Sequence, residues 1–182
     1  MLNTILASSL SEAEAHYREI YELRVPLMRF LTDLGIPLPR AFQAAAEFTI
    51  NGDLRRIFEG EEFDAEPMRR LLNEARSVKV ELDVTTLEYT LRKAIEKMMR
   101  RLDAAPNDGN LLHAIQRAVG LGASLPFEIN LWTVQNIYYE MLQAKYPAFL
   151  AGAERGDGSA RVWVDRFTAL GAQLGIRISV QA

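Results

Sequence analysis

Two lines of polar side chains on apolar segments are the residues best placed to do chemistry in this sequence. The segment Pro39 to Asn51 is mostly Ala, Phe and Ile, but Gln43, Glu47 and Asn51 interrupt it at intervals of four residues. A helix advances about 100° per residue, so this spacing places the three side chains on one line. Amides and carboxylates in a line can hydrogen-bond a ligand. The alternative interpretation is a narrow solvent-facing strip on a mostly buried helix.

The second line belongs to the segment Ile129 to Tyr146, which has the wider apolar arc. Gln135 projects near the middle of this arc, and Asn136 lies at its margin beside Trp132. An amide inside an apolar arc needs hydrogen-bond partners, because leaving it unsatisfied costs about 1–3 kcal/mol. It is therefore either a satisfied structural amide or a group that contacts a ligand.

We expect the two lines to lie side by side and to share one network or groove, because the chain has few other polar lines on apolar helices. Glu47 is the natural acceptor for the amide N–H of Gln135. In a sealed network, Gln135→Leu is then tolerated better than Glu47→Ala, which strands a donor. In a network open to solvent, Trp132 is an aromatic platform for a sugar. The candidate ligand-binding residues are Gln43, Glu47, Asn51, Trp132, Gln135 and Asn136.

The available residue types exclude several other chemistries. Cysteine is absent, which rules out disulfides, thiolate metal sites and a Cys nucleophile. Neither His16 nor His113 is followed four residues later by His, Asp or Glu, the spacing typical of helical zinc sites. Gly120-Leu121-Gly122 is interpreted as a helix stop, and Arg155-Gly156-Asp157 as a turn. We expect no metal, no cofactor and no catalytic residue in this chain.

A cluster of basic residues falls on the outer face of one predicted helix: Arg92, Lys93, Lys97, Arg100 and Arg101. Phosphate contact is one interpretation of this cluster. A solvated face is the favoured one, because Glu88 and Glu96 are interspersed and the net charge is −3. Nucleic acid is therefore not an expected partner.

The elements that must position these side chains are helices, because strand patterns are nearly absent. Amphipathic stripes predict an all-α fold, a multi-helix bundle of about seven to eight helices covering more than half of the chain. A short extended tail is expected at Ile176 to Val180. Residues 1–182 show no internal repeat, low-complexity tract or long linker, which predicts a single helical domain.

Residues that start and stop helices give the expected boundaries. Pro26 should kink the first helix and Gly35 should end it. Asn51-Gly52-Asp53 should break the second helix. Three later helices have N-terminal signals, namely Asp64, a capping box of Thr85 with Glu88, and Ser159.

The N-terminal segment has no basic region, and its first acidic residue is Glu12. Both features argue against a secretory signal. No apolar run approaches the roughly 20 residues that span a bilayer. We therefore expect a cytoplasmic protein with no membrane partner.

Two stretches, LMRFLTDLGIPLPRAFQAAAEFTINGDLRR and SLPFEINLWTVQNIYYEML, carry a family resemblance. They resemble the C-terminal helical region of unknown function in family 57 glycoside-hydrolase-like (alpha-amylase/alpha-mannosidase-like) proteins, and the likeness runs from Leu10 to Leu174. The resemblance implies that a β/α barrel with two catalytic carboxylates precedes this region and acts on α-glucans or related polysaccharides. No alternating strand and helix pattern precedes the motifs here. The chain is therefore expected to be a fragment or a separated C-terminal domain of a larger protein.

The leading hypothesis is a non-catalytic helical accessory domain that packs on the catalytic barrel and supports an α-glucan site in carbohydrate metabolism. By itself such a chain is not an enzyme and hydrolyses no glycoside, whereas its parent protein is a glycoside hydrolase. The expected partners are the barrel and a polysaccharide. The alternative is a helical protein-interaction or dimerisation module with no carbohydrate role, which forms a homo-oligomer.

Overall fold

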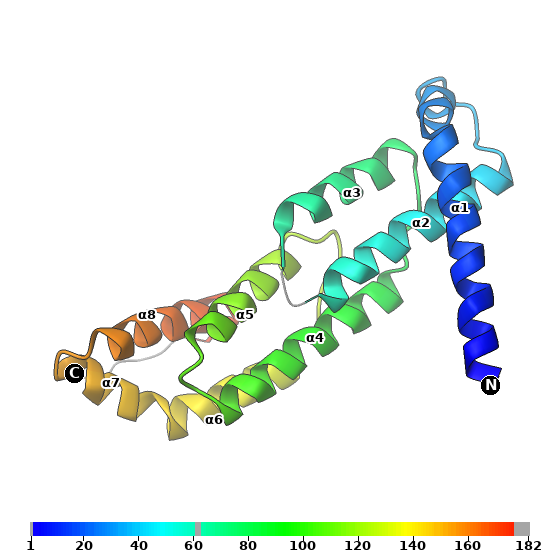
Figure 1. Ribbon diagram of the computed structural model, residues 1–182. Coiled ribbons are helices and arrows are strands. Elements are labelled where there is room, and N and C mark those ends of the chain that lie inside the picture. Colours follow the sequence, from blue (N-terminus) through cyan, green and yellow to red (C-terminus); the bar gives the residue numbers. More distant parts are fainter. Residues whose placement is uncertain (1, 61–62, 177–182) are drawn as a thin grey trace. The chain divides into compact units, whose positions relative to one another are not determined.

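The structure, a computed structural model, describes residues 2–60 and 63–176, and side chains from Ser11 onward. The helices in these residues are α1 (Leu2–Asp33), α2 (Arg40–Glu59), α3 (Ala65–Ser77), α4 (Val84–Ala104), α5 (Gly109–Gly122), α6 (Trp132–Ala144), α7 (Tyr146–Glu154) and α8 (Gly158–Gln173) (Figure 1). Helices make up 79% of the described chain, and no strand occurs in it. The predicted all-α fold is confirmed. The predicted tail after Ile176 lies outside the described residues.

The described residues group into two compact units. Unit 1 falls within Met1–Ile57 and Asp64–Leu87 and holds α1, α3, most of α2 and the first turn of α4. Unit 2 falls within Phe58–Phe63 and Glu88–Ala182 and holds the rest of α4 together with α5 to α8. Within the described ranges, no helix is both long and apolar enough to cross a membrane.

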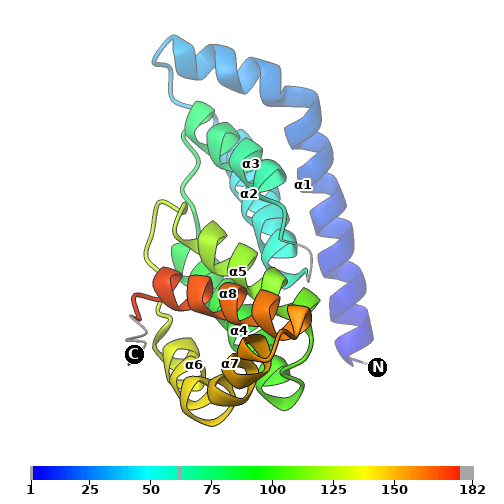
Figure 2. The same ribbon diagram turned by 90° about the vertical axis from the view of Figure 1, so that its left-hand side faces the viewer.

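The long helix α1 changes direction before it ends (Figure 2). Pro26 lies inside α1 and accounts for this bend, because its ring removes a backbone N–H and crowds the preceding turn. The helix stops in a Schellman motif, in which the Ile36 N–H donates to Leu31 O at 2.9 Å. Gly35 takes a φ of +71°, a conformation that glycine adopts without strain. The predicted stop at Gly35 is confirmed.

The predicted break in the second helix at Asn51-Gly52-Asp53 is wrong, because α2 continues through these residues to Glu59. Asn and Asp usually interrupt helices by bonding their own backbone. Here the Asp53 carboxylate pairs with Arg18 of α1 instead, and the Asn51 amide bonds to the segment before α4. Tertiary contacts therefore occupy the side chains that would otherwise end the helix.

Aspartates begin four of the later helices, α3, α4, α5 and α8. Asp64 accepts a hydrogen bond from the Glu66 N–H, which confirms the predicted cap of α3. At α4, the capping box predicted at Thr85 is wrong, because Asp83 accepts from the Thr86 N–H at 3.1 Å and Thr85 lies within the helix. A carboxylate also suits the positive end of the helix dipole.

The N-cap of α8 is Asp157, which accepts hydrogen bonds from the backbone N–H groups of Ser159 and Ala160. These bonds lower the pKa of Asp157 below its ordinary value. The predicted cap at Ser159 is therefore wrong. Gly156, with a φ of +91°, lets the chain turn before Asp157, so Arg155-Gly156-Asp157 forms a turn, as predicted.

In unit 2, α8 packs against α5 and α7, and α6 packs against α7. Aromatic rings fill the space between these helices: Tyr138 stacks on Phe167 at 4.2 Å between ring centroids, and Trp163 stacks on Phe167 at 4.6 Å. The Tyr138 hydroxyl donates to Phe167 O at 2.9 Å. This buried arrangement fixes the orientation of α6, whose opposite side is exposed.

Candidate functional site

The predicted line of polar side chains on α2 is present, but these side chains form hydrogen bonds with one another and with other residues of unit 1. The Gln43 amide donates to Glu47 Oε1 at 2.9 Å, along the exposed side of the helix. The Asn51 amide donates to Glu47 O at 2.9 Å and to Glu81 O at 3.1 Å, and Asn51 Oδ1 accepts from the Asp83 N–H at 2.8 Å. Asn51 thus ties the segment between α3 and α4 to α2, which is a structural role.

Glu47 and Asn51 nevertheless line an open groove of about 530 Å³ in unit 1. The rings of Tyr17 and Phe48 stand in its wall with centroids 5.0 Å apart, and both are partly exposed. The Asp83 carboxylate in the same wall caps α4. Gln43 lines a separate, smaller groove beside Gly35. Two of the three predicted α2 residues therefore lie in one groove, the third lies in another, and the aromatic pair was not predicted.

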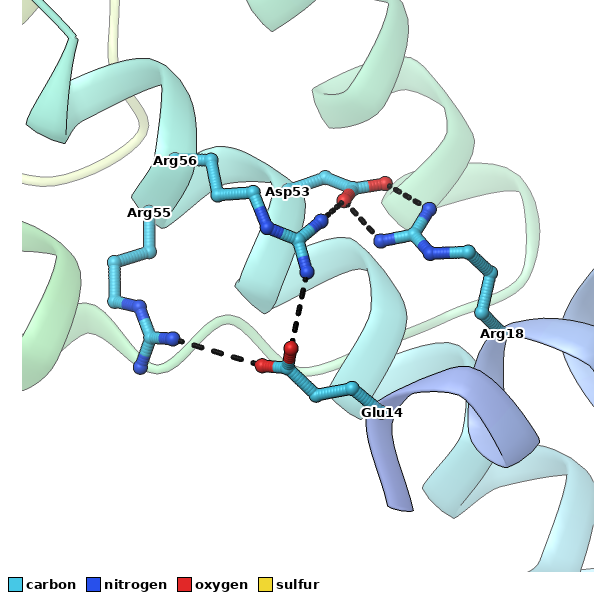
Figure 3. Close-up of polar contacts among 5 residues, drawn as sticks. All are labelled: Glu14, Arg18, Asp53, Arg55 and Arg56. Carbon is cyan, nitrogen blue, oxygen red and sulfur yellow. Dashed lines mark hydrogen bonds and ion pairs between the residues drawn. The ribbon is translucent and has the colours of Figure 1, made fainter. Parts of the chain in front are cut away.

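A network of five charged side chains joins α1 to α2 at this groove (Figure 3). Arg18 donates to both carboxylate oxygens of Asp53, at 3.0 and 2.5 Å, and these bonds raise the pKa of Arg18 above its ordinary value. Arg56 bridges Asp53, at 2.5 Å, and Glu14, at 3.3 Å. Arg55 lies 3.8 Å from the other oxygen of Glu14. Glu14 and Asp53 are therefore held by arginines, an arrangement that supports helix packing rather than acid–base chemistry.

The predicted residues on α6 point in two directions. The Gln135 amide donates to Leu174 O at 2.9 Å, at the end of α8 in the same unit. Trp132 is 67% exposed, and Asn136 is also exposed. Gln135 is thus a satisfied structural amide, whereas Trp132 and Asn136 face solvent. Sequence reasoning missed Tyr139, which is 53% exposed on the same side of α6.

The two lines have separate partners, each within its own unit, so the hydrogen bond expected between Gln135 and Glu47 is replaced by Gln135 with Leu174 and Glu47 with Gln43. The reason for expecting a shared network was the need to satisfy Gln135, and that need is met inside unit 2. The side-by-side placement of the two helices stays a prediction.

These partners reverse the expected order of two substitutions. Gln135→Leu leaves the Leu174 carbonyl without its side-chain donor, and we expect a loss of about 1–2 kcal/mol in the free energy of unfolding. Glu47→Ala removes only an exposed contact between residues four apart, for which about 0.5 kcal/mol or less is expected. Urea unfolding of the two variants measures both values. Equal losses, or a larger loss for Glu47→Ala, would show that Glu47 has the structural role.

The basic face of α4 is interleaved with acids, as the favoured interpretation expects. Arg92 donates to Glu88 at 2.9 Å, and Lys93 donates to Glu96 at 2.8 Å. Burial alone would raise the pKa of Glu96, but its bonds to Lys93 and Arg92 outweigh burial and lower it. Glu88 also accepts from the Asn130 N–H at 3.2 Å and so holds the segment before α6. These charges stabilise unit 2.

The histidines make no metal cluster in the described part of the chain, where no three His, Asp or Glu side chains gather closely enough to hold an ion. Glu12 stands four residues before His16, but the His16 ring contacts the main-chain oxygen of Glu12 at 2.8 Å. His16 therefore bonds the backbone of its own helix.

A row of exposed apolar side chains in unit 1 lies along α1 and the residue that follows it, and it was not predicted from the sequence. We call it the α1 apolar face; its members are Ile20, Leu23, Leu27, Phe30 and Leu34, which are 37%, 68%, 41%, 58% and 58% exposed. Tyr21 and Met28, on the other side of α1, are buried. The signal was present in the sequence, because α1 has apolar residues on both sides, and a helix that contacts its own domain with one side needs only one apolar stripe.

Comparison with known proteins gives no assignment, since no protein-family model, curated protein or solved structure matches this chain.

Proposed function

We propose that this chain is a non-catalytic helical accessory domain that binds another protein through the α1 apolar face. The observation that carries the proposal is the exposure of five large apolar side chains at intervals of three and four residues, four of them in α1 and the fifth, Leu34, directly after it. Exposed apolar residues scattered singly are ordinary, but a contiguous row marks a contact surface.

The α1 apolar face is stabilised when another apolar surface covers it. Burying a Leu or Phe side chain contributes about 1.5–3 kcal/mol relative to leaving it in water. Leu23, Phe30 and Leu34, the most exposed members, make only part of this contribution to the folding of unit 1. A helix with anchors spaced in this way is suited to lie in an apolar groove of a partner.

The partner we propose is the catalytic barrel of a family 57-like glycoside hydrolase, with the chain packing on it and supporting its α-glucan site. This choice of partner rests on the resemblance of the stretches from Leu27 and Ser124 to the helical region of that family. The carboxylates around the groove of unit 1 are engaged with arginines, an amide and a helix terminus, which agrees with a role in packing.

A second candidate is a dimerisation module with no carbohydrate role, in which a second copy covers the same face. The spacing of Leu23, Leu27, Phe30 and Leu34 favours it specifically, because side chains at intervals of four and three residues are those with which helices pack on helices. The two candidates predict different partners for one surface.

The test replaces two members of the face, Leu23→Asp with Phe30→Asp. Folding should be little affected, within about 1 kcal/mol for the pair, because both side chains are mostly exposed. Binding to a purified family 57 catalytic barrel, measured by calorimetry, should weaken by at least about thirtyfold, since central apolar anchors carry about 2 kcal/mol or more each. Val162→Asp is the matched control, because Val162 is an exposed apolar residue on α8.

Light scattering on the chain alone separates the candidates. A wild-type dimer that becomes a monomer in the double variant supports the dimerisation module. Barrel binding that is lost in the double variant supports the accessory domain. A monomeric chain whose barrel binding is absent, or unchanged by the substitutions, would contradict both.

A further inference from the structure

One side of α6 carries a row of alternating rings and amides, which we call the aromatic–amide row: Trp132, Asn136, Tyr139 and Gln143. The intervals of four, three and four residues place these side chains on one line. All four are exposed, Trp132 by 67% and Tyr139 by 53%. None of them carries a charge, although a quarter of the chain is charged.

The spacing of the two rings is held by the packing of α6. On the other side of the helix, Val134, Tyr138 and Met141 are buried, and the Tyr138 hydroxyl is bonded to α8. The first turn is fixed by Asn130 Oδ1, which accepts from the Trp132 N–H at 3.0 Å. Seven residues of helix separate Trp132 from Tyr139 by about 10 Å along the axis. The rings therefore form two preset platforms with an amide between them.

The chemistry of this row differs from that of the α1 apolar face. The α1 face consists of aliphatic side chains and one Phe, with no hydrogen-bonding group, and suits an apolar protein surface. In the row on α6 each ring is followed by an amide, and an amide both donates and accepts hydrogen bonds. A ligand that matches it needs flat apolar C–H faces alternating with hydroxyl groups, and no negative charge, because the exposed Glu140 follows Tyr139.

From this pattern we propose that the aromatic–amide row binds an uncharged carbohydrate chain. The apolar faces of successive sugar rings lie on Trp132 and Tyr139, and hydroxyl groups bond to Asn136 and Gln143. The inference deepens the proposed function, since it names the residues through which an accessory domain would hold a polysaccharide. It uses a different helix from the α1 apolar face, so the two can fail separately.

Tryptophan fluorescence tests the proposal on the full chain. Two oligosaccharides serve as probes, the α-linked maltoheptaose and the β-linked cellohexaose. The chain has two tryptophans, and Trp163 is only 4% exposed, with its Nε1–H donated to Pro106 O. Trp163 nevertheless lines a groove of its own, so a change in emission on titration reports Trp132 when it is absent from the Trp132→Ala variant. We expect saturable binding of at least one of the two oligosaccharides, and protection of Trp132 from quenching by acrylamide.

Variants then assign the binding to the row. Trp132→Ala and Tyr139→Ala should each weaken binding by roughly twofold to tenfold, the range of a single aromatic contact, with the Trp132→Ala variant followed by calorimetry. Tyr89→Ala is the matched control, because Tyr89 is a 54% exposed tyrosine on α4 that lies next to Arg92 and Lys93 rather than next to amides. Its affinity should equal that of the wild type.

Absence of saturable binding of both oligosaccharides at millimolar concentration would overturn the proposal. So would binding that survives the double substitution of Trp132 and Tyr139. If the double variant instead loses barrel binding and the wild type binds no oligosaccharide, the row is a protein contact. Loss of oligosaccharide binding with barrel binding intact supports the proposal, whatever the outcome for the α1 apolar face.

Discussion

Gly171→Ala is expected to lower the free energy of unfolding by about 3 kcal/mol, because the added methyl group has no room. A Cβ at this position would lie 2.3 Å from Tyr138 Oη and 2.9 Å from Tyr138 Cζ. Tyr138 cannot move aside cheaply, since its ring is buried against Phe167 and its hydroxyl is bonded to Phe167 O. Relief of the clash therefore breaks either the stacking or the hydrogen bond.

Urea unfolding of the variant, compared with Gly120→Ala, measures this effect. Gly120 lies inside α5, where the nearest atom to an added Cβ is Gln173 Nε2 at 3.4 Å. Its replacement should stabilise the chain by about 0.5–1 kcal/mol through helix propensity. In a double-mutant cycle, Tyr138→Phe should recover part of the loss, because it removes the closest oxygen. A Gly171→Ala variant as stable as the wild type would show that α6 and α8 are not packed this closely.

Asn51→Ala is expected to lower the free energy of unfolding by about 2 kcal/mol. The substitution removes three hydrogen bonds at once, those with Glu47 O, Glu81 O and the Asp83 N–H. Each bond contributes about 0.5–1.5 kcal/mol, and partial exposure lets water replace some of that. Asp83 also caps α4, so loss of Asn51 should loosen the start of that helix.

The control is Gln43→Ala. Gln43 makes a single exposed hydrogen bond, to Glu47 four residues later, and its replacement should lower the free energy of unfolding by about 0.5 kcal/mol or less. Hydrogen exchange at the Asp83 amide gives a local measurement that global unfolding does not. We expect exchange there to accelerate in Asn51→Ala and to stay unchanged in Gln43→Ala. Similar stability of both variants would mean that the segment before α4 is held by other contacts.

Local chemistry was sufficient to predict several features of unit 1 and unit 2. Gly35 stops α1 because the required φ is positive, and Asp64 caps α3 because its short carboxylate reaches the next backbone N–H groups. The caps at Thr85 and Ser159 were wrong although residues of the right type stand there. In both cases an aspartate two residues earlier is the N-cap. Residue type alone does not show which of two neighbouring residues, both suited to an N-cap, takes that position.

In the candidate site, too, some features follow from the local sequence and others depend on the tertiary structure. Helical spacing correctly placed Gln43, Glu47 and Asn51 in line, and it identified Gln135 as an amide in need of a partner. It could not name the partners, because Leu174 is 39 residues away from Gln135 and Glu81 is 30 residues away from Asn51. Nor could it show that Trp132 faces solvent while Gln135 does not, since this depends on which side of α6 the other helices cover.

The sequence by itself determined the helical class, the residue types available for chemistry and most of the apolar stripes, because these follow from composition and from a period of about 3.6 residues. Tertiary structure alone decided that α2 continues through Asn51-Gly52-Asp53, that Glu14 and Asp53 are held by arginines, and that one apolar side of α1 is left exposed. The physical reason is that a side chain's burial and its hydrogen-bond partners are set by neighbours distant in the chain, whereas periodicity reports only the neighbours within a few turns.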